Sequence, residues 1–165
     1  MDERYLCDAM MGGLARLLRA AGHDTRLAAP GAPDADLLAL AAEEGRLLLT
    51  RDRALAARAG TGALLLREGR TDDQAAELSR IRPVDWRSAA FSRCLVDNTP
   101  LREASADEIA RAPASSRVLP GPFRVCPACA RLYWPGSHVR RMQGCLDRLA
   151  GLCTSAGRPE NSTST

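Results

Sequence analysis

Three aspartates in the first third of the chain stand where their carboxylates could serve one metal ion. Asp8 directly follows the short segment Arg4–Cys7, and Asp52 follows the apolar run Leu47–Thr50 by one residue. If both segments are parallel strands, these acids lie at the carboxyl edge of the sheet, where ligands bind in open α/β folds. Asp36 starts the helical segment before Leu47 and can approach from the same edge. Carboxylates gathered there suit Mg²⁺ or Mn²⁺, which activates a bound water and orients a phosphodiester.

The neighbours of Asp52 are also suited to phosphate. Arg51 and Arg53 flank it, and guanidinium groups bind phosphate oxygens through paired hydrogen bonds. A plainer interpretation stays open for all of these residues. Asp8 and Asp36 are also common residue choices for helix caps or solvated surfaces, and Thr50-Arg51-Asp52-Arg53 also fits an exposed turn.

The second group of chemically interesting residues is rich in cysteine. Cys126 and Cys129 form a CxxC motif, and the other cysteines are Cys7, Cys94, Cys145 and Cys153. A second CxxC upstream would indicate a four-cysteine zinc site, but the chain has Cys94-Leu95-Val96-Asp97. Cys7 lies within an apolar segment and is expected in the core.

The elements that must position the acids alternate along residues 1–85. Strands are expected at 4–7, 25–28, 47–50 and 63–66, and helices at 14–21, 34–44, 53–59 and 71–80. Unbroken apolar strands that alternate with helices predict an α/β fold with a parallel sheet covered on both faces. Residues 86–142 are rich in proline and cysteine, which indicates a small module stabilised by a metal ion. Residues 143–165 read as an extension that is disordered from about residue 154.

Composition limits the choice of partners. All 23 basic residues are arginine, so no lysine is available as a Schiff base, phosphate clamp or general base. Residues 1–85 carry 12 arginines and 14 acids, and residues 86–165 carry 11 arginines and 6 acids. An acidic half joined to a basic half suits a metal site beside a surface for a polyanion. No segment has the length of a membrane helix and no signal peptide is recognised, so a cytoplasmic protein without a membrane partner is expected.

Several long motifs resemble the Mut-seven C-terminal RNase domain family. They are Leu6–Arg19 with Gly22-His23-Asp24-Thr25, then Glu43–Arg53, and then Pro127-Ala128-Cys129 through Tyr133-Trp134-Pro135-Gly136-Ser137-His138 to Met142. The resemblance spans about residues 4–142. It implies a PIN-like nuclease fold fused to a zinc ribbon, with RNA as the substrate. By position, the acidic residues of the family fall on Asp8, Asp36 and Asp52, and Asp73 is a candidate fourth acid that also fits a helix cap.

The resemblance implies a cysteine at position 97, where this chain has Asp97. Three alternatives follow for the ribbon. Asp97 supplies an oxygen ligand beside Cys94, Cys126 and Cys129; or His138, Cys145 or Cys153 supplies the fourth ligand; or the zinc has been lost. Arginines interleaved with Tyr133 and Trp134 could bind single-stranded nucleic acid, although both rings also fit the small core of the ribbon.

Two functions remain open at this point. The first is a metal-dependent ribonuclease that uses Asp8, Asp36 and Asp52. The second is a catalytically silent RNA-binding or adaptor module with the same fold. A phosphoacceptor receiver domain is disfavoured because it needs a lysine near its aspartate. A dinucleotide-binding enzyme is disfavoured because Met11-Gly12-Gly13 is not the required glycine fingerprint.

Overall fold

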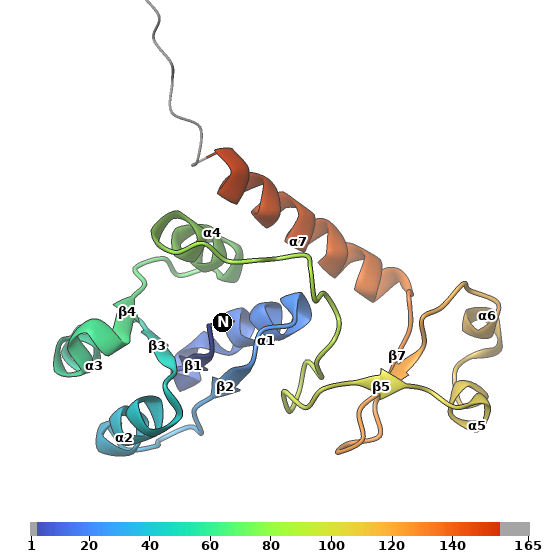
Figure 1. The fold of residues 1–165 in the computed structure, drawn as a ribbon, viewed down its shortest axis with the longest axis horizontal. Coiled ribbons are helices and arrows are strands. Elements are labelled where there is room, and N and C mark those ends of the chain that lie inside the picture. The colour runs from blue at the N-terminus through green and yellow to red at the C-terminus, as the bar shows by residue number, and fades with distance from the viewer. Residues whose placement is uncertain (1–2, 156–165) are drawn as a thin grey trace, which may run out of the picture.

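The computed structural model describes residues 3–155 and, within that range, the side chains up to residue 152. Its first half forms a parallel sheet with helices in the connections (Figure 1). The elements are β1 (Tyr5–Cys7), η1 (Ala9–Met11), α1 (Gly12–Ala21), β2 (Thr25–Leu27), α2 (Asp34–Glu44), β3 (Leu47–Thr50), α3 (Arg53–Ala59), η2 (Gly60–Gly62), β4 (Ala63–Leu65) and α4 (Thr71–Ile81). The expected α/β fold with a parallel sheet is confirmed.

The strand order is β2-β1-β3-β4, and all neighbouring strands are parallel. The chain leaves β1 toward β2 and then crosses over to β3 on the other side of β1. The strand order therefore reverses between β1 and β3. A crevice at such a reversal, outside the carboxyl ends of the strands, is the usual ligand site of open α/β sheets.

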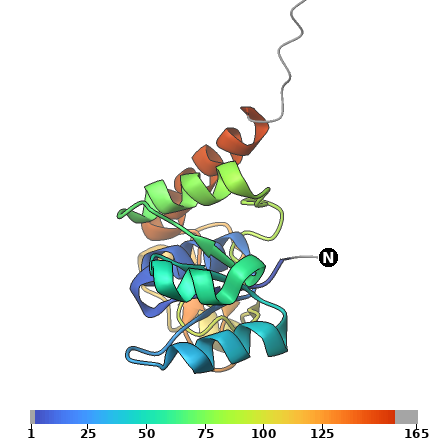
Figure 2. The same cartoon turned by 90° about the vertical axis from the view of Figure 1, so that its left-hand side faces the viewer.

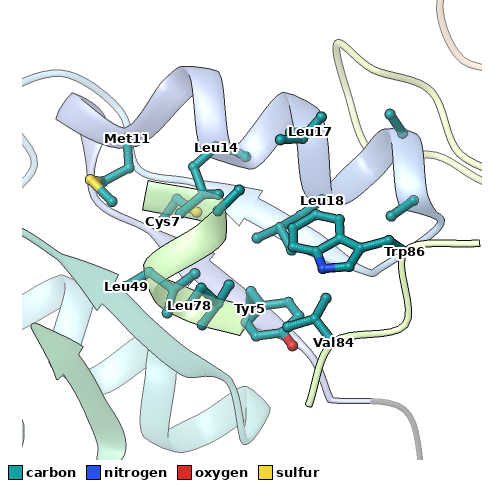
Figure 3. Close-up of a cluster of buried hydrophobic side chains, with 14 of the residues drawn as sticks. Tyr5, Cys7, Met11, Leu14, Leu17, Leu18, Leu49, Leu78, Val84 and Trp86 are labelled. Atoms are coloured by element: carbon teal, nitrogen blue, oxygen red, sulfur yellow. The ribbon is translucent and has the colours of Figure 1, made fainter. Parts of the chain in front are cut away.

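Alternate residues of the strands serve two different cores. Tyr5, Cys7 and Leu49 face a large cluster beneath α1 and α4, to which Trp86 contributes (Figure 3). Leu6 and Leu48 face a smaller cluster with residues from α2 and α3. Because successive side chains of a strand point to opposite faces, one apolar run fills both layers. Burial raises the pKa of the Cys7 thiol to about 12, as suits a core thiol.

A close contact locks the start of α1 against α4. A Cβ atom at Gly13 would lie 2.2 Å from Oγ1 of Thr71, the first residue of α4. This close approach sets the position of α1, which follows Asp8 and η1.

We predict that Gly13→Ala destabilises the fold by about 1–2 kcal/mol, because overpacking exceeds the gain of about 1 kcal/mol in helix propensity. Denaturant unfolding measures the change. Thr71→Ala in the same chain should restore most of the loss, and Gly62→Ala is a control because its Cβ would meet nothing within 4 Å. Equal stability of Gly13→Ala and the parent chain would contradict the contact.

The second half contains a small antiparallel sheet and one long helix. Its elements are β5 (Arg102–Glu103), α5 (Ala106–Ile109), α6 (Ala114–Arg117), β6 (Arg124–Val125), β7 (Leu132–Tyr133) and α7 (Ser137–Ser155), with sheet order β5-β6-β7. Helix α7 packs on α1 and α4. The chain therefore returns from the small sheet to the helices that cover the parallel sheet (Figure 2).

Helix α7 crosses the boundary expected at residue 142, so the expected extension begins inside a helix. The tail expected to be disordered lies, from residue 156 onward, outside the described residues. None of the helices between residues 3 and 155 has the length and apolar character needed to cross a membrane.

Candidate active site and metal centre

A buried threonine joins two of the three candidate acids. The Thr50 hydroxyl donates to Oδ2 of Asp8 at 2.9 Å and accepts the backbone N–H of Asp52 at 3.0 Å. The Asp8 backbone N–H also donates to the Leu49 carbonyl at 3.0 Å. Thr50 therefore ties the Asp8 side chain to the Asp52 backbone at the carboxyl ends of β1 and β3, where the strand order reverses.

Each of these carboxylates keeps an oxygen available. Asp8 is half-buried and uses Oδ2 for Thr50. Asp52 is exposed, and its Oδ1 accepts the N–H groups of Ala54 at 2.7 Å and Leu55 at 3.0 Å, which caps α3. Among the described residues, no donor bonds Oδ1 of Asp8 or Oδ2 of Asp52. One oxygen of each carboxylate is fixed by the fold, and the other faces no protein partner.

Asp36 occupies a different position. It is exposed in the first turn of α2 and lines an open hollow of about 660 Å³ beside β2, together with Asp24 and Asp97. Within residues 3–152, no hydrogen bond joins Asp36 to Asp8 or Asp52. In the described part of the chain, the carboxylates of these three acids do not all lie within 4.8 Å of one another. Among the described residues, Thr50 links Asp8 to the Asp52 backbone, and no such link reaches Asp36.

The remaining residues expected at this site lie on the surface. Arg51 and Arg53 are exposed on either side of Asp52. Asp73 is exposed in the first turn of α4, with its carboxylate 3.9 Å from the guanidinium of Arg70. The Thr50 bridge was not expected, although a polar residue that ends the run Leu47–Thr50 is a signal that could have indicated it.

A second constellation forms around the cysteines. Cys94, Asp97, Cys126 and Cys129 each offer a ligand atom, and these atoms all lie within 4.8 Å of one another. Sγ of Cys94 lies 3.7 Å from Sγ of Cys129, and Sγ of Cys126 lies 3.4 Å from each Asp97 oxygen. Zinc–sulfur bonds of about 2.3 Å in a tetrahedron separate two sulfurs by about 3.8 Å. The four residues could hold a metal ion with ligands at tetrahedral spacing.

The two halves of this cluster share one backbone design. Asn98 donates its N–H to the Cys94 carbonyl at 3.1 Å, and Ala130 donates to the Cys126 carbonyl at 2.9 Å. Both Asn98 and Ala130 have positive φ, at 69° and 56°. The N–H groups of Cys94 and Cys126 then bond the carbonyls of Thr99 and Arg131, in the same order. Asp97 therefore occupies in the first loop the place that Cys129 has in the second.

Hydrogen bonds connect the acid of the cluster to its thiols. Partial burial opposes charge on Asp97, but hydrogen bonds from Cys129 and Thr99 outweigh it and hold the pKa of that carboxyl well below its usual range. The hydrogen bond to Asp97 in turn raises the pKa of Cys129 to about 12. A cation that binds here must displace the thiol proton, so its affinity will fall as pH falls.

Residues outside the cluster hold its first loop in place. The Tyr133 hydroxyl accepts the Leu95 N–H at 3.0 Å and lies 3.2 Å from Sγ of Cys94. The buried Arg19 of α1 donates to the carbonyls of Leu95 and Val96 at 3.2 and 2.8 Å. The loop is thus tied both to β7 and to the parallel-sheet domain. Sequence reasoning missed Arg19, and an arginine on the apolar face of a helix is the signal that could have found it.

The other candidate fourth ligands point elsewhere. Nε2 of His138 lies 2.8 Å from a guanidinium nitrogen of Arg16, and Sγ of Cys145 lies 3.7 Å from an Asp72 oxygen. Neither belongs to the cluster. The side chain of Cys153 lies outside the described residues.

These features agree with a comparison against protein families. The model of the Mut7-C RNAse domain matches residues 3–146. The chain belongs to this family. The match covers the parallel sheet, the cysteine cluster and the first part of α7, so the Mut7-C domain includes both constellations. Searches of curated proteins and of solved structures found no match.

Proposed function

We propose that this Mut7-C chain is a metal-dependent ribonuclease whose site is centred on Asp8 and Asp52, with Asp36 as a third acid. The observation that carries the proposal is the Thr50 hydroxyl, which holds Asp8 and the Asp52 backbone at the point where the strand order reverses. The family match supports a nuclease that acts on RNA.

The free carboxylate oxygens fit a hard, hydrated cation. Each of Asp8 and Asp52 has one oxygen without a described donor, and Mg²⁺ is usually bound by one or two carboxylates with several retained waters. When bound, Mg²⁺ or Mn²⁺ would lower the pKa of an attacking water and neutralise charge on the leaving oxygen. Retained waters also allow Asp36 to contribute from the rim of the hollow without direct contact.

The residues around the acids have roles that follow from their chemistry. Arg51 and Arg53 would bind the phosphates on either side of the scissile bond through charge-assisted hydrogen bonds. Asp73 would remain a surface residue in the first turn of α4, where the helix dipole favours an acid, with an ion pair to Arg70.

We further propose that the metal at Cys94, Asp97, Cys126 and Cys129 is a structural zinc ion. Three thiolates and a carboxylate are suitable zinc donors, and no fifth ligand is needed to complete a tetrahedron. The small sheet β5-β6-β7 buries only a small apolar cluster, with Phe123 and Val125 at its centre. A module of this size is only marginally stable on such a core, so a bound metal would add needed stability.

Incubation of the zinc-loaded chain with single-stranded RNA, duplex RNA and single-stranded DNA tests the activity. Cleavage of RNA that requires added Mg²⁺ or Mn²⁺ is expected. RNA binding without cleavage under every metal condition would instead indicate a silent binding module.

We predict that Thr50→Val lowers the rate of RNA cleavage by about tenfold or more. The substitution keeps the shape of the side chain but removes the hydroxyl that positions Asp8 and Asp52. Single-turnover cleavage measures the rate, and thermal unfolding checks the fold. Thr61→Val is a matched control because Thr61 is exposed in η2, just before β4. A parental rate for Thr50→Val would show that the bridge does not position the acids.

A further inference from the structure

We propose that a pocket between β7, α6 and the start of α7 binds an unpaired RNA nucleotide next to the acidic site. This inference deepens the proposed ribonuclease function and rests on it. The pocket, called here the α7 pocket, has a volume of about 550 Å³, which is in the range of small-molecule sites. Its principal residues are Arg16, Arg131, Tyr133, Trp134, His138 and Arg140.

The charged residues of the α7 pocket are all basic. Three arginines and a histidine line it, and no aspartate or glutamate is among its lining residues. The hollow beside β2 is different, because Asp24, Asp36 and Asp97 line it and its buried arginines already bond protein groups. The α7 pocket is therefore the hollow that complements a phosphate.

The cations of the α7 pocket retain donors for a ligand. Arg16 and His138 fix each other at 2.8 Å, and Arg140 donates one nitrogen to the Pro135 carbonyl at 2.9 Å. Among the described residues, the guanidinium of Arg131 has no hydrogen bond or ion pair. Arginine presents several N–H groups in a plane, so the remaining ones can bind phosphate oxygens.

The inner wall of the α7 pocket is apolar and aromatic. Leu95 is buried there, and the half-buried ring of Trp134 lies beside Gly136. A Cβ atom at Gly136 would come within 2.9 Å of Nε1 of Trp134, so glycine permits this position of the indole. Aromatic rings provide stacking platforms for bases, and arginines nearby follow the backbone. An aromatic wall with a cationic rim fits a nucleotide better than it fits an apolar peptide.

The position of Arg16 connects the α7 pocket to the acids. Helix α1 begins at Gly12, directly after the turn that carries Asp8, and Arg16 lies about 6 Å further along its axis. Arg16 and His138 also line a smaller adjoining hollow that reaches Thr71 at the start of α4. An RNA strand whose scissile phosphate lies at the carboxyl edge of the sheet would thus pass Arg16 and place an unpaired base against Trp134.

Binding can be measured separately from cleavage. The zinc-loaded Asp8→Asn/Asp52→Asn chain without Mg²⁺ is titrated with a short oligoadenylate and with an abasic oligomer of equal charge. Tryptophan fluorescence reports stacking on Trp134, because the other tryptophan, Trp86, is 1% exposed in the core and out of reach of a ligand. Oligoadenylate should quench the emission, and the abasic oligomer should bind about tenfold more weakly without quenching. A failure of cleavage in the parent chain leaves this result unaffected.

Variants separate the base from the phosphates. Trp134→Leu should weaken oligoadenylate binding about tenfold with an unchanged salt dependence. Arg131→Gln/Arg140→Gln should reduce the slope of log K against log salt by about 1.4. Arg67→Gln/Arg80→Gln, at two exposed arginines outside the pocket, is the charge-matched control.

Three results would overturn the proposal. They are equal affinity for the abasic and the adenylate oligomers, unchanged affinity in both the Trp134 and the arginine variants, and quenching by an apolar peptide that oligoadenylate does not displace. The last result would assign the α7 pocket to a protein partner. If Trp134→Leu unfolds, Trp134→Phe and the arginine pair still provide the test.

Discussion

Asp8→Asn is expected to reduce RNA cleavage by about 100-fold or more while the chain stays folded. The amide can still accept the Thr50 hydroxyl, so the geometry at the ends of β1 and β3 persists. The negative charge that would hold a divalent cation is lost. Since that cation would supply both the activated water and the charge stabilisation, the loss should appear in the rate at saturating RNA.

Substitutions of other aspartates serve as controls for Asp8→Asn. Asp73→Asn removes one exposed carboxylate from the first turn of α4 and should leave the cleavage rate within about twofold, because its ion pair with Arg70 is a surface interaction. Asp36→Asn should have an intermediate effect, because no described hydrogen bond ties Asp36 to the Thr50 bridge. Equal losses for Asp8→Asn and Asp73→Asn would indicate a general effect of charge on RNA binding.

Asp97→Cys is expected to raise the zinc affinity by about tenfold or more, because thiolate-rich sites suit zinc better than sites with a carboxylate. The loop already places residue 97 where Cys129 stands in the second loop, so a thiol there completes a tetrahedron without backbone change. A tenfold gain corresponds to about 1.4 kcal/mol, which at saturating zinc raises the melting temperature by about 3–6 °C.

Asp97→Ala provides the opposite arm of this test. Loss of the fourth ligand should abolish most of the thermal stabilisation by zinc. Competition with a chromogenic chelator measures the affinity, and thermal unfolding with and without zinc measures the stabilisation. Cys145→Ala is the control, because Cys145 lies outside the cluster and should change neither quantity. Zinc affinity that is the same in the parent, Asp97→Ala and Asp97→Cys chains would exclude Asp97 as a ligand.

The sequence predicts the parallel sheet well because its strands are short apolar runs between strong helix signals. Leu47–Thr50 is buried at every position, which agrees with a strand covered on both faces. The place of Asp8 then follows, because a residue directly after a strand must lie at the edge of the sheet. Asp52 follows in the same way.

The failures of prediction have physical reasons. Helix α7 was missed because Gly144 and Gly151 lower its helix propensity, although Met142, Leu146 and Leu149 repeat at helical spacing. The convergence of Asp36 with the other acids stays a prediction, because the rotation of a first turn is not encoded in spacing. The ties of Arg19 to the first cysteine loop are tertiary, at a separation of 76 residues for Leu95, and no local pattern reveals them.

Cleavage of single-stranded RNA by the zinc-loaded Asp8→Asn/Asp52→Asn chain tests the central claim most directly. The parent chain and the double variant are compared at saturating Mn²⁺ and in its absence, with zinc content and melting temperature measured on both. We predict metal-dependent cleavage by the parent chain and none by the double variant, with the same zinc content in each. Cleavage by the double variant at the parental rate would contradict an active site at the ends of β1 and β3.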